Sequence, residues 1–120
     1  SQIVLPLVPS VPDLTGTITN TTLTRLTLDP GYYLISYSVS CIFRTPSYMQ
    51  VTPTYNSAAH LETGVYFATS ANGSSASGSS HFILFVPDPS PTEFYLTFNS
   101  PTTATDGAIT LAILKLNRLP

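Results

Sequence analysis

The chain has few charged residues. Of its 120 residues only 8% are Asp, Glu, Lys or Arg, and the net charge is −2, whereas about a quarter of an average soluble domain is charged. The four basic residues are spread along the chain; they are Arg25, Arg44, Lys115 and Arg118. Nucleic acids and anionic membranes are bound by clusters of cations that neutralise phosphates. We therefore expect neither nucleic acid nor a membrane surface among the partners.

Cysteine and long apolar runs are also scarce. Cys41 is the only cysteine, so an intrachain disulfide cannot form. It lies in an alternation of apolar residues, which predicts that its side chain is a small buried hydrophobic group and not a reactive one. No apolar run has the length of a membrane span, and no basic segment leads into an apolar stretch as in a signal peptide. Membrane insertion is therefore not expected.

Helical periodicity is absent, because eleven prolines interrupt the chain at short intervals. What is present is alternation with a period of two, which is typical of β-strands. It is clearest in GYYLISYSVSCIF, residues 31–43, whose odd-numbered positions from Tyr33 to Phe43 are apolar while Ser36, Ser38 and Ser40 lie on the other face. The preceding DPG, residues 29–31, is typical of a turn.

Further strands are expected at regular spacing between turn signals. Their ranges are 2–8, 15–19, 23–28, 48–54, 61–69, 80–86, 93–99 and 108–117. Residues 70–80, SANGSSASGSS, are expected to form a Gly/Ser-rich loop or a weak strand edge. The pattern predicts an all-β protein, an antiparallel two-sheet jelly-roll sandwich of about ten strands without helices. We expect a single jelly-roll domain over residues 1–120, with residues 1–13 as an extended N-terminal lead-in from a stalk.

Three of these segments carry apolar side chains on both faces; they are 81–87, 93–99 and 108–117. In the last of them Ile109, Leu111 and Ile113 alternate with Ala112, Leu114 and Leu116. Helices cover such strands in parallel sheets, but this chain has none. We therefore predict an obligate homo-oligomer whose subunits cover the second face. The alternative is a small barrel with scattered apolar groups on its outside, which soluble proteins tolerate.

The order of these segments resembles a known family. LDPGYYLISYSVS (28–40), TGVYFAT (63–69), SSHFILFVP (79–87), FYLTFNSP (94–101) and DGAITLAILKLN (106–117) are similar to the C-terminal globular head of collagen-like glycoproteins on the spores of bacilli and clostridia. They also resemble the wider tumour-necrosis-factor and complement globular-head superfamily. The resemblance covers most of residues 14–117 and depends on the order and spacing of strands, not on a single motif.

The resemblance implies a ten-stranded jelly roll that forms a homotrimer, with one face of the last strand turned toward the threefold axis. Carried over to this chain, Ile109, Leu111 and Ile113 would be internal. By similar logic Ile83 and Phe85 would be internal as well. The residues implied at the trimer interface are Phe82, Leu84, Thr110, Ala112, Leu114 and Leu116.

Catalytic and metal-binding chemistry finds little support in the sequence. The two histidines, His60 and His81, lie outside any recognisable nucleophile motif, so an enzyme is not expected. In HLE the spacing of His60 and Glu62 suits a chelate on one strand face, but two ligands are too few for structural zinc. Cofactors are not expected. Calcium held by Asp88 or Asp106 is the alternative to their role as turn residues.

The resemblance implies a non-enzymatic structural head of a collagen-like glycoprotein. It would lie outside the cell on the exosporium, the outer layer of the bacterial spore, where it would start the triple-helical stalk, form the exposed knob and contribute to adhesion to a host or spore-surface ligand. One alternative is a lectin-like carbohydrate- or receptor-binding head, with Tyr48 and Tyr55 as candidate ligand-facing aromatics. The other is the knob of a phage or viral fibre.

Overall fold

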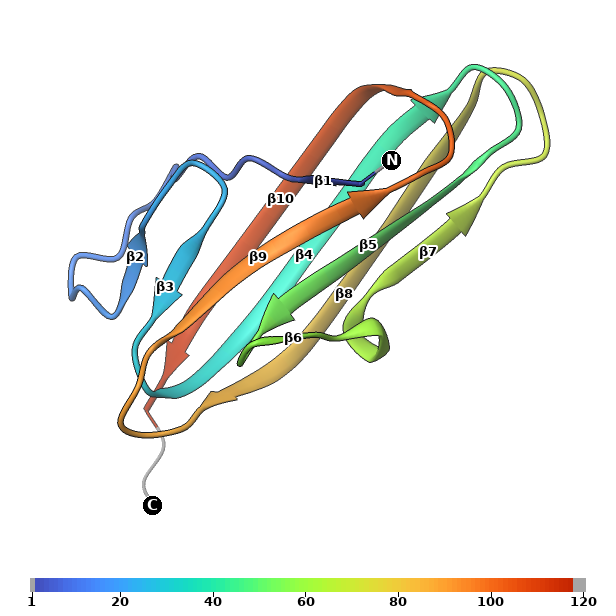
Figure 1. Cartoon of the computed structure of the whole chain (residues 1–120). Coiled ribbons are helices and arrows are strands. Elements are labelled where there is room, and N and C mark those ends of the chain that lie inside the picture. The colour runs from blue at the N-terminus through green and yellow to red at the C-terminus, as the bar shows by residue number, and fades with distance from the viewer. Residues whose placement is uncertain (1, 118–120) are drawn as a thin grey trace.

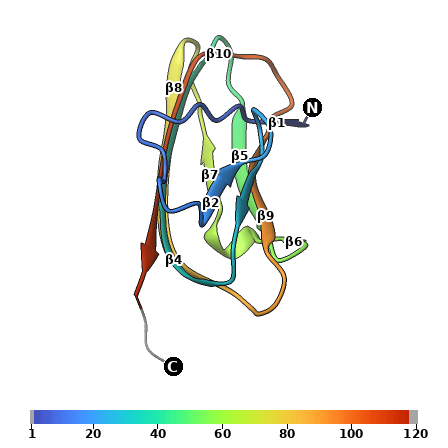
Figure 2. The same cartoon turned by 90° about the vertical axis from the view of Figure 1, so that its left-hand side faces the viewer.

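The computed structural model describes residues 2–117 as two antiparallel sheets packed face to face (Figures 1 and 2). The larger sheet has seven strands: β1 (Gln2–Val4), β2 (Ile18–Asn20), β3 (Leu26–Leu28), β5 (Tyr48–Tyr55), β6 (Ala58–Ala59), β7 (Val65–Ala68) and β9 (Thr92–Asn99). The smaller sheet has three long strands: β4 (Gly31–Phe43), β8 (Ser74–Val86) and β10 (Ala104–Leu116). The predicted all-β sandwich is confirmed.

The chain crosses repeatedly between the two sheets. It passes from β3 to β4, back to β5, β6 and β7, across to β8, back to β9 and finally to β10. This order is that of a jelly roll. In the smaller sheet β4 lies in the middle and pairs with β10 on one side and β8 on the other. The sandwich is long and narrow, with extents of 50 × 26 × 20 Å.

The core lies between the sheets and is made by the inward half of each alternation. The odd-numbered residues of β4 from Tyr33 to Phe43 are all buried, as the sequence predicts. From the larger sheet Met49, Val51, Phe94 and Leu96 meet them, and each has no exposed surface. Cys41 is buried among these residues, as predicted, with its Sγ 3.8 Å from the Met49 sulfur.

The start of β4 follows the predicted turn at DPG. Gly31 has a φ of 144°, a conformation that favours glycine, and a Cβ there would lie 2.7 Å from Lys115 Nζ. The Tyr33 hydroxyl donates a hydrogen bond to the Asp29 carbonyl oxygen over 2.6 Å. The turn and the first core residue of the strand are thus tied together.

Several predicted boundaries change in the structure. The expected strand 2–8 ends at Val4, ahead of Pro6, whose ring nitrogen cannot donate to a ladder. The expected strand 61–69 divides into a single 3₁₀ turn, Leu61–Thr63, and β7. Residues 74–79, expected as a loop or a weak strand edge, are part of the edge strand β8, because each pairs with β4 from Phe43 to Ser38. None of the helical residues described forms a segment long and apolar enough to cross a membrane.

Candidate functional site

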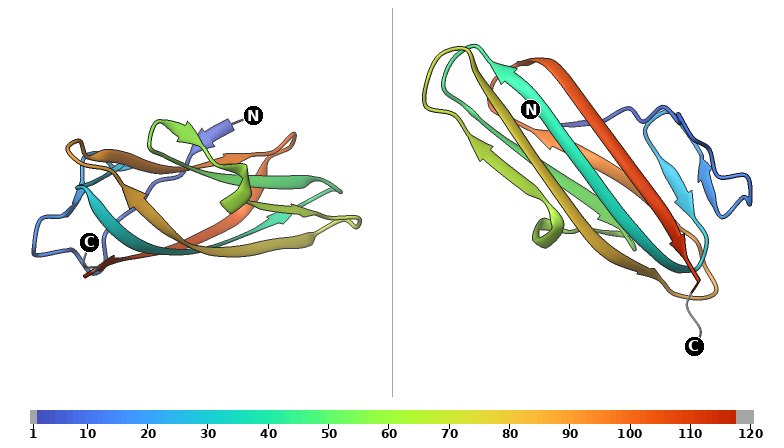
Figure 3. Two further views of the ribbon diagram at one scale, coloured as in Figure 1. Left: turned by 90° about the horizontal axis from the view of Figure 1, so that it is seen from below. Right: turned by 180° about the vertical axis from the view of Figure 1, so that it is seen from behind.

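The outer face of the smaller sheet is built from cross-strand rows. Paired residues of neighbouring strands share a face, and the inward set of β4 identifies the outward set. Figure 3 (right) shows this sheet from its outer side. From the end of β10 backwards, the outward rows are Leu116–Tyr32–Phe85, Leu114–Leu34–Ile83, Ala112–Ser36–His81, Thr110–Ser38–Ser79 and Ala108–Ser40–Ser77.

The first two rows form a continuous apolar surface, which we call the apolar end; its residues are Tyr32, Leu34, Ile83, Phe85, Leu114 and Leu116. Ile83 is 57% exposed, Phe85 48% and Leu114 60%. The Tyr32 and Phe85 rings lie 4.7 Å apart between centroids, so they pack on one another rather than into the core. Such a contiguous exposed apolar surface typically marks an interaction site.

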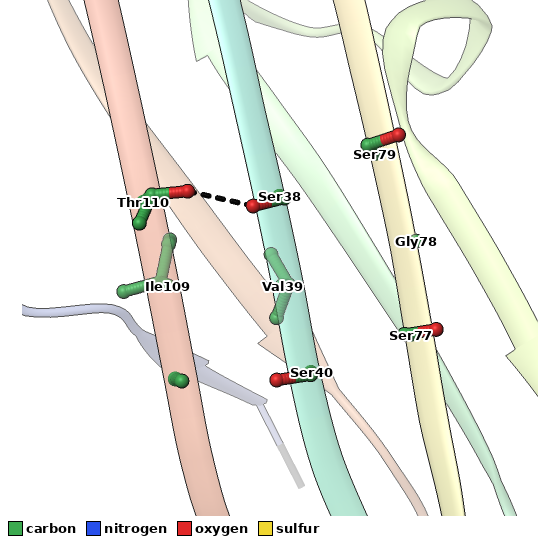
Figure 4. Close-up of a pocket in the computed structure, with 9 residues that line it drawn as sticks. Ser38, Val39, Ser40, Ser77, Gly78, Ser79, Ile109 and Thr110 are labelled. Carbon is green, nitrogen blue, oxygen red and sulfur yellow. Dashed lines mark hydrogen bonds between the residues drawn. The ribbon is translucent and has the colours of Figure 1, made fainter.

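The next rows carry small side chains. Ser38, Ser40, Ser77, Ser79, Ala108 and Thr110 surround a shallow hollow of about 370 Å³ (Figure 4). The hydroxyls of Ser38 and Thr110 are hydrogen-bonded over 2.6 Å, as the dashed line in Figure 4 shows. Small groups at these positions leave the backbone of the sheet close to the surface, so another chain can approach it closely.

Charge is excluded from all five rows. Asp, Glu, Lys and Arg occupy none of the outward positions, and His81 is the one titratable residue besides Tyr32. Lys115 lies on the opposite side of β10, with its Nζ 5.6 Å from the centroid of the Tyr33 ring. Burying this face against another chain would therefore desolvate no full charge, which is the costliest part of burying a surface.

The outward assignment of Phe82 and Leu84 is wrong. Leu84 is 1% exposed and Phe82 packs against the core, while their neighbours Ile83 and Phe85 face outward. The register with β4 explains this, because Leu84 pairs with Tyr33 and Phe82 with Ile35, both buried. Residues 82–85 are all apolar, so both faces of this part of the strand are apolar. The sequence alone therefore does not determine which of the two sets points inward.

The assignment on β10 agrees with the observed faces. Ile109, Leu111 and Ile113 pack against the core as expected. Thr110, Ala112 and Leu114 are exposed on the outer face, and Leu116 is half-buried there. Sequence reasoning missed Tyr32 and Leu34 as neighbours of this surface, although their positions outside the core alternation of residues 31–43 were a usable signal.

Segment 93–99 does not join this surface. It forms β9 of the larger sheet, where Phe94 and Leu96 point into the core and Phe98 packs against it. Its outward residues are Glu93, Tyr95, Thr97 and Asn99. The expectation that another subunit must cover the second face of this segment is therefore wrong, because only one of its two faces is mainly apolar.

The two candidate ligand-facing tyrosines differ in exposure. Tyr48 is 36% exposed, and its ring stacks on that of Tyr66 at 5.4 Å. Tyr55 is 8% exposed and is covered by the His60 ring, 3.8 Å away and parallel within 2°. A ligand cannot reach the ring of Tyr55, so its assignment as a ligand-facing aromatic is wrong.

The residues singled out for metal or catalytic chemistry have structural contacts or lie apart. His60 Nδ1 is 2.8 Å from Glu62 Oε2, and its Nε2 is 3.0 Å from the Tyr55 carbonyl oxygen. The hydrogen bond with His60 holds the pKa of Glu62 below its usual range. Asp88 and Asp106 are exposed. Within residues 2–117, no three His, Cys, Asp or Glu side chains are grouped to hold a metal ion.

Asp13 is a structural carboxylate. Its Oδ1 accepts hydrogen bonds from the Thr15 amide and hydroxyl, and its Oδ2 from the Thr17 amide and hydroxyl and the Ile18 amide, all within 3.0 Å. The bonds from Thr15, then Thr17, hold the pKa of Asp13 well below its usual range. Asp13 therefore orders the loop that leads into β2.

Comparison with models of known protein families finds no match, and no curated protein matches the chain either.

Proposed function

We propose that this domain is the non-enzymatic, homotrimeric head of a collagen-like glycoprotein on the surface of a bacterial spore, assembled through the outer face of β4, β8 and β10. The observation that carries the proposal is the apolar end. Three large apolar side chains, Ile83, Phe85 and Leu114, are each about half exposed or more in the single chain, in adjacent rows that lack any charge.

Self-association would be driven by burial of the apolar end. Covered apolar surface contributes about 25 cal/mol per Å² in gross terms. The loss of translational and rotational freedom, with side-chain ordering, opposes this by about 4–15 kcal/mol. Because of this cost, the proposal has the whole outer face covered and not the apolar end alone. The same face in water would leave Leu34, Ile83 and Leu114 side by side as an association hazard.

The small residues in the other rows support close approach of several copies. Ala108, Thr110 and Ala112 lie along β10 on the outer side, where strands that converge on a common axis have little room. A head of this kind would also hold three stalk chains at one end. The effective concentration of the tethered chains then favours winding of the stalk.

The test is the mass of the domain in solution, measured by sedimentation equilibrium and light scattering. We expect three chains per particle for the native sequence. Leu114→Asp would place up to three carboxylates in the buried face and should yield monomers with an unchanged circular dichroism spectrum, because Leu114 is 60% exposed in the single chain.

Leu23→Asp is the matched control. Leu23 is 62% exposed in the loop between β2 and β3, two strands of the larger sheet, so this variant adds the same charge outside the proposed interface and should stay trimeric. A monomeric, soluble native protein would contradict the proposal. So would a Leu114→Asp protein that assembles as the native chain does.

A further inference from the structure

We propose that the outer face of the larger sheet carries a binding site for a sugar that bears a carboxylate, centred on Arg25. This face is turned to the viewer in Figure 1. It holds a second hollow, of about 630 Å³, whose lining includes Gln2 of β1, Thr54 of β5, Ala59 of β6 and Glu93 and Tyr95 of β9, together with Arg25. We call it the Arg25 hollow. It is on the opposite side of the sandwich from the proposed trimer face.

The register places three polar groups of the hollow, those of Arg25, Tyr95 and Thr54, in one row. Leu26 pairs with Phe94, which puts Arg25 beside Tyr95. Tyr95 in turn pairs with Thr54, and Thr54 pairs with Ala59. Since Phe94 and Leu96 are fully buried, Tyr95 between them must point outward. The cation, the aromatic ring and a hydroxyl thus lie side by side on adjacent strands.

The guanidinium group of Arg25 is held in place but has no anionic partner. Its central carbon lies 4.0 Å from the centroid of the Tyr95 ring, a stacking contact that orients the planar group. Among residues 2–117 the one ion pair is His60–Glu62, so no described carboxylate neutralises Arg25. A planar guanidinium with unpaired N–H groups suits a carboxylate, which it binds through two parallel hydrogen bonds.

The other groups of the hollow indicate a sugar. The Thr54 hydroxyl and the Gln2 amide both donate and accept hydrogen bonds, and the exposed Glu93 carboxylate accepts them from hydroxyl groups. Glu93 also opposes a ligand with several negative charges, such as a phosphate ester or a nucleic acid, because the lining of the hollow holds one cation, Arg25, and one anion, Glu93. A single carboxylate on a ring with several hydroxyls fits this arrangement.

The site does not depend on the proposed trimer, since it is complete within one chain. Trimerisation would present three copies on one particle, and a surface with many acidic sugars would then be held far more tightly than a single sugar. A single site of this size, open to solvent, is expected to bind with a Kd of roughly millimolar order.

The experiment is an NMR titration of the ¹⁵N-labelled domain with two acidic probes, methyl β-D-glucuronide and the methyl glycoside of N-acetylneuraminic acid. Methyl β-D-glucoside is the neutral match. We expect at least one acidic probe to shift the Arg25 side-chain N–H signal and the amides of residues 54, 59 and 93–97. The neutral sugar should bind at least about tenfold more weakly, the effect of losing a charge-assisted hydrogen bond.

Arg25→Gln should remove the shifts, and Arg44→Gln is the matched control, because Arg44 is an exposed arginine outside this hollow. The absence of shifts with both acidic probes at tens of millimolar would overturn the proposal. It would also be overturned by equal binding of the neutral sugar, or by binding that survives Arg25→Gln. The mass measurements on the native chain fail or succeed independently of these outcomes.

Discussion

The two outer faces of the sandwich have opposite character although one chain and one kind of strand build both. On the larger sheet the outward residues of β5 and β9 are polar or amphipathic, including Gln50, Thr54, Glu93, Tyr95 and Asn99. On the smaller sheet the outward rows are apolar at one end and small and uncharged at the other. The first face is compatible with water as it stands, whereas the second is compatible with another protein surface.

This difference shows where the functional information lies. Both sheets contribute apolar side chains to the core by the same inward alternation. The inner faces therefore explain why a sandwich forms, but they do not distinguish one function from another. The outer faces are free of that requirement, and the difference in their composition is the basis for proposing ligand binding on one and self-association on the other. Exchanging inward and outward residues is therefore the most direct way to test the comparison.

The largest effect is expected from neighbours on β8 that point in opposite directions. Leu84→Ala should lower the free energy of unfolding by about 2–5 kcal/mol, because it leaves a cavity at a core position that is 1% exposed. Ile83→Ala, one residue earlier and 57% exposed, should cost less than about 1 kcal/mol. Urea unfolding of both changes in the Leu114→Asp background removes the contribution of assembly, and equal losses would contradict the assigned faces.

A smaller effect is expected at Gly78, which faces inward between Ser77 and Ser79. A Cβ at Gly78 would lie 2.0 Å from Val65 Cγ1 and 3.3 Å from Val65 Cβ. Gly78→Ala should therefore destabilise the fold by about 1–3 kcal/mol through overpacking. Ser79→Ala, on the outer side of the same strand, should change the urea midpoint little, and a stable Gly78→Ala protein would refute the close packing of β7 on β8.

Alkaline pH should act on the core beneath the smaller sheet. Burial raises the pKa of both Tyr33 and Tyr37 from near 10 to about 12. Since the folded values are the higher ones, the stabilisation is fully present below about pH 10 and is lost as the pH rises through 12. Urea midpoints should fall across this interval, and they should fall less in Tyr37→Phe, which lacks one of the two phenols. A flat profile for the native chain would argue against burial of these hydroxyls.

The smallest effect is expected on the polar outer face. Arg25→Gln removes a stacking contact at a half-exposed position and should lower the free energy of unfolding by about 0.5–1 kcal/mol at most. The same urea experiment measures it. A loss as large as that of Leu84→Ala would mean that Arg25 serves the fold rather than a ligand.

Much of the fold could be predicted because the alternation in residues 31–43 is unambiguous. The core face of β4 follows from it, and so does the burial of Cys41, whereas the inward face of β10 was implied only by the family resemblance, because residues 108–117 are apolar on both faces. The failures come from segments where local pattern and pairing disagree. Residues 74–79 contain four serines, an alanine and a glycine, a composition that left both a loop and a weak strand edge open, and pairing with β4 from Phe43 to Ser38 makes them strand. Residues 82–85 are all apolar, so nothing in this segment indicated which alternate residues point into the core.

The candidate sites were less accessible to prediction. The apolar end combines residues from three strands, and only the register of these strands brings them together. Its residues on β4 and β8 are about 50 positions apart in the chain, and those on β8 and β10 are about 30 apart. Arg25 appeared in the sequence as one of four scattered cations, and its contact with Tyr95, seventy residues later, depends on the pairing of β3 with β9. The burial of Tyr55 could not be predicted from the sequence either, because it depends on the His60 ring that stacks on the Tyr55 ring.

By itself the sequence determined that the chain forms strands, because a period of two in apolar residues is a local property that can be recognised within a single short segment. It also determined how sparse the charge is, with four basic and six acidic residues among 120. Only the tertiary structure decided which of two apolar faces enters the core, since that choice depends on hydrogen-bonded register between strands distant in the chain. It likewise decided which uncharged residues gather into one exposed surface.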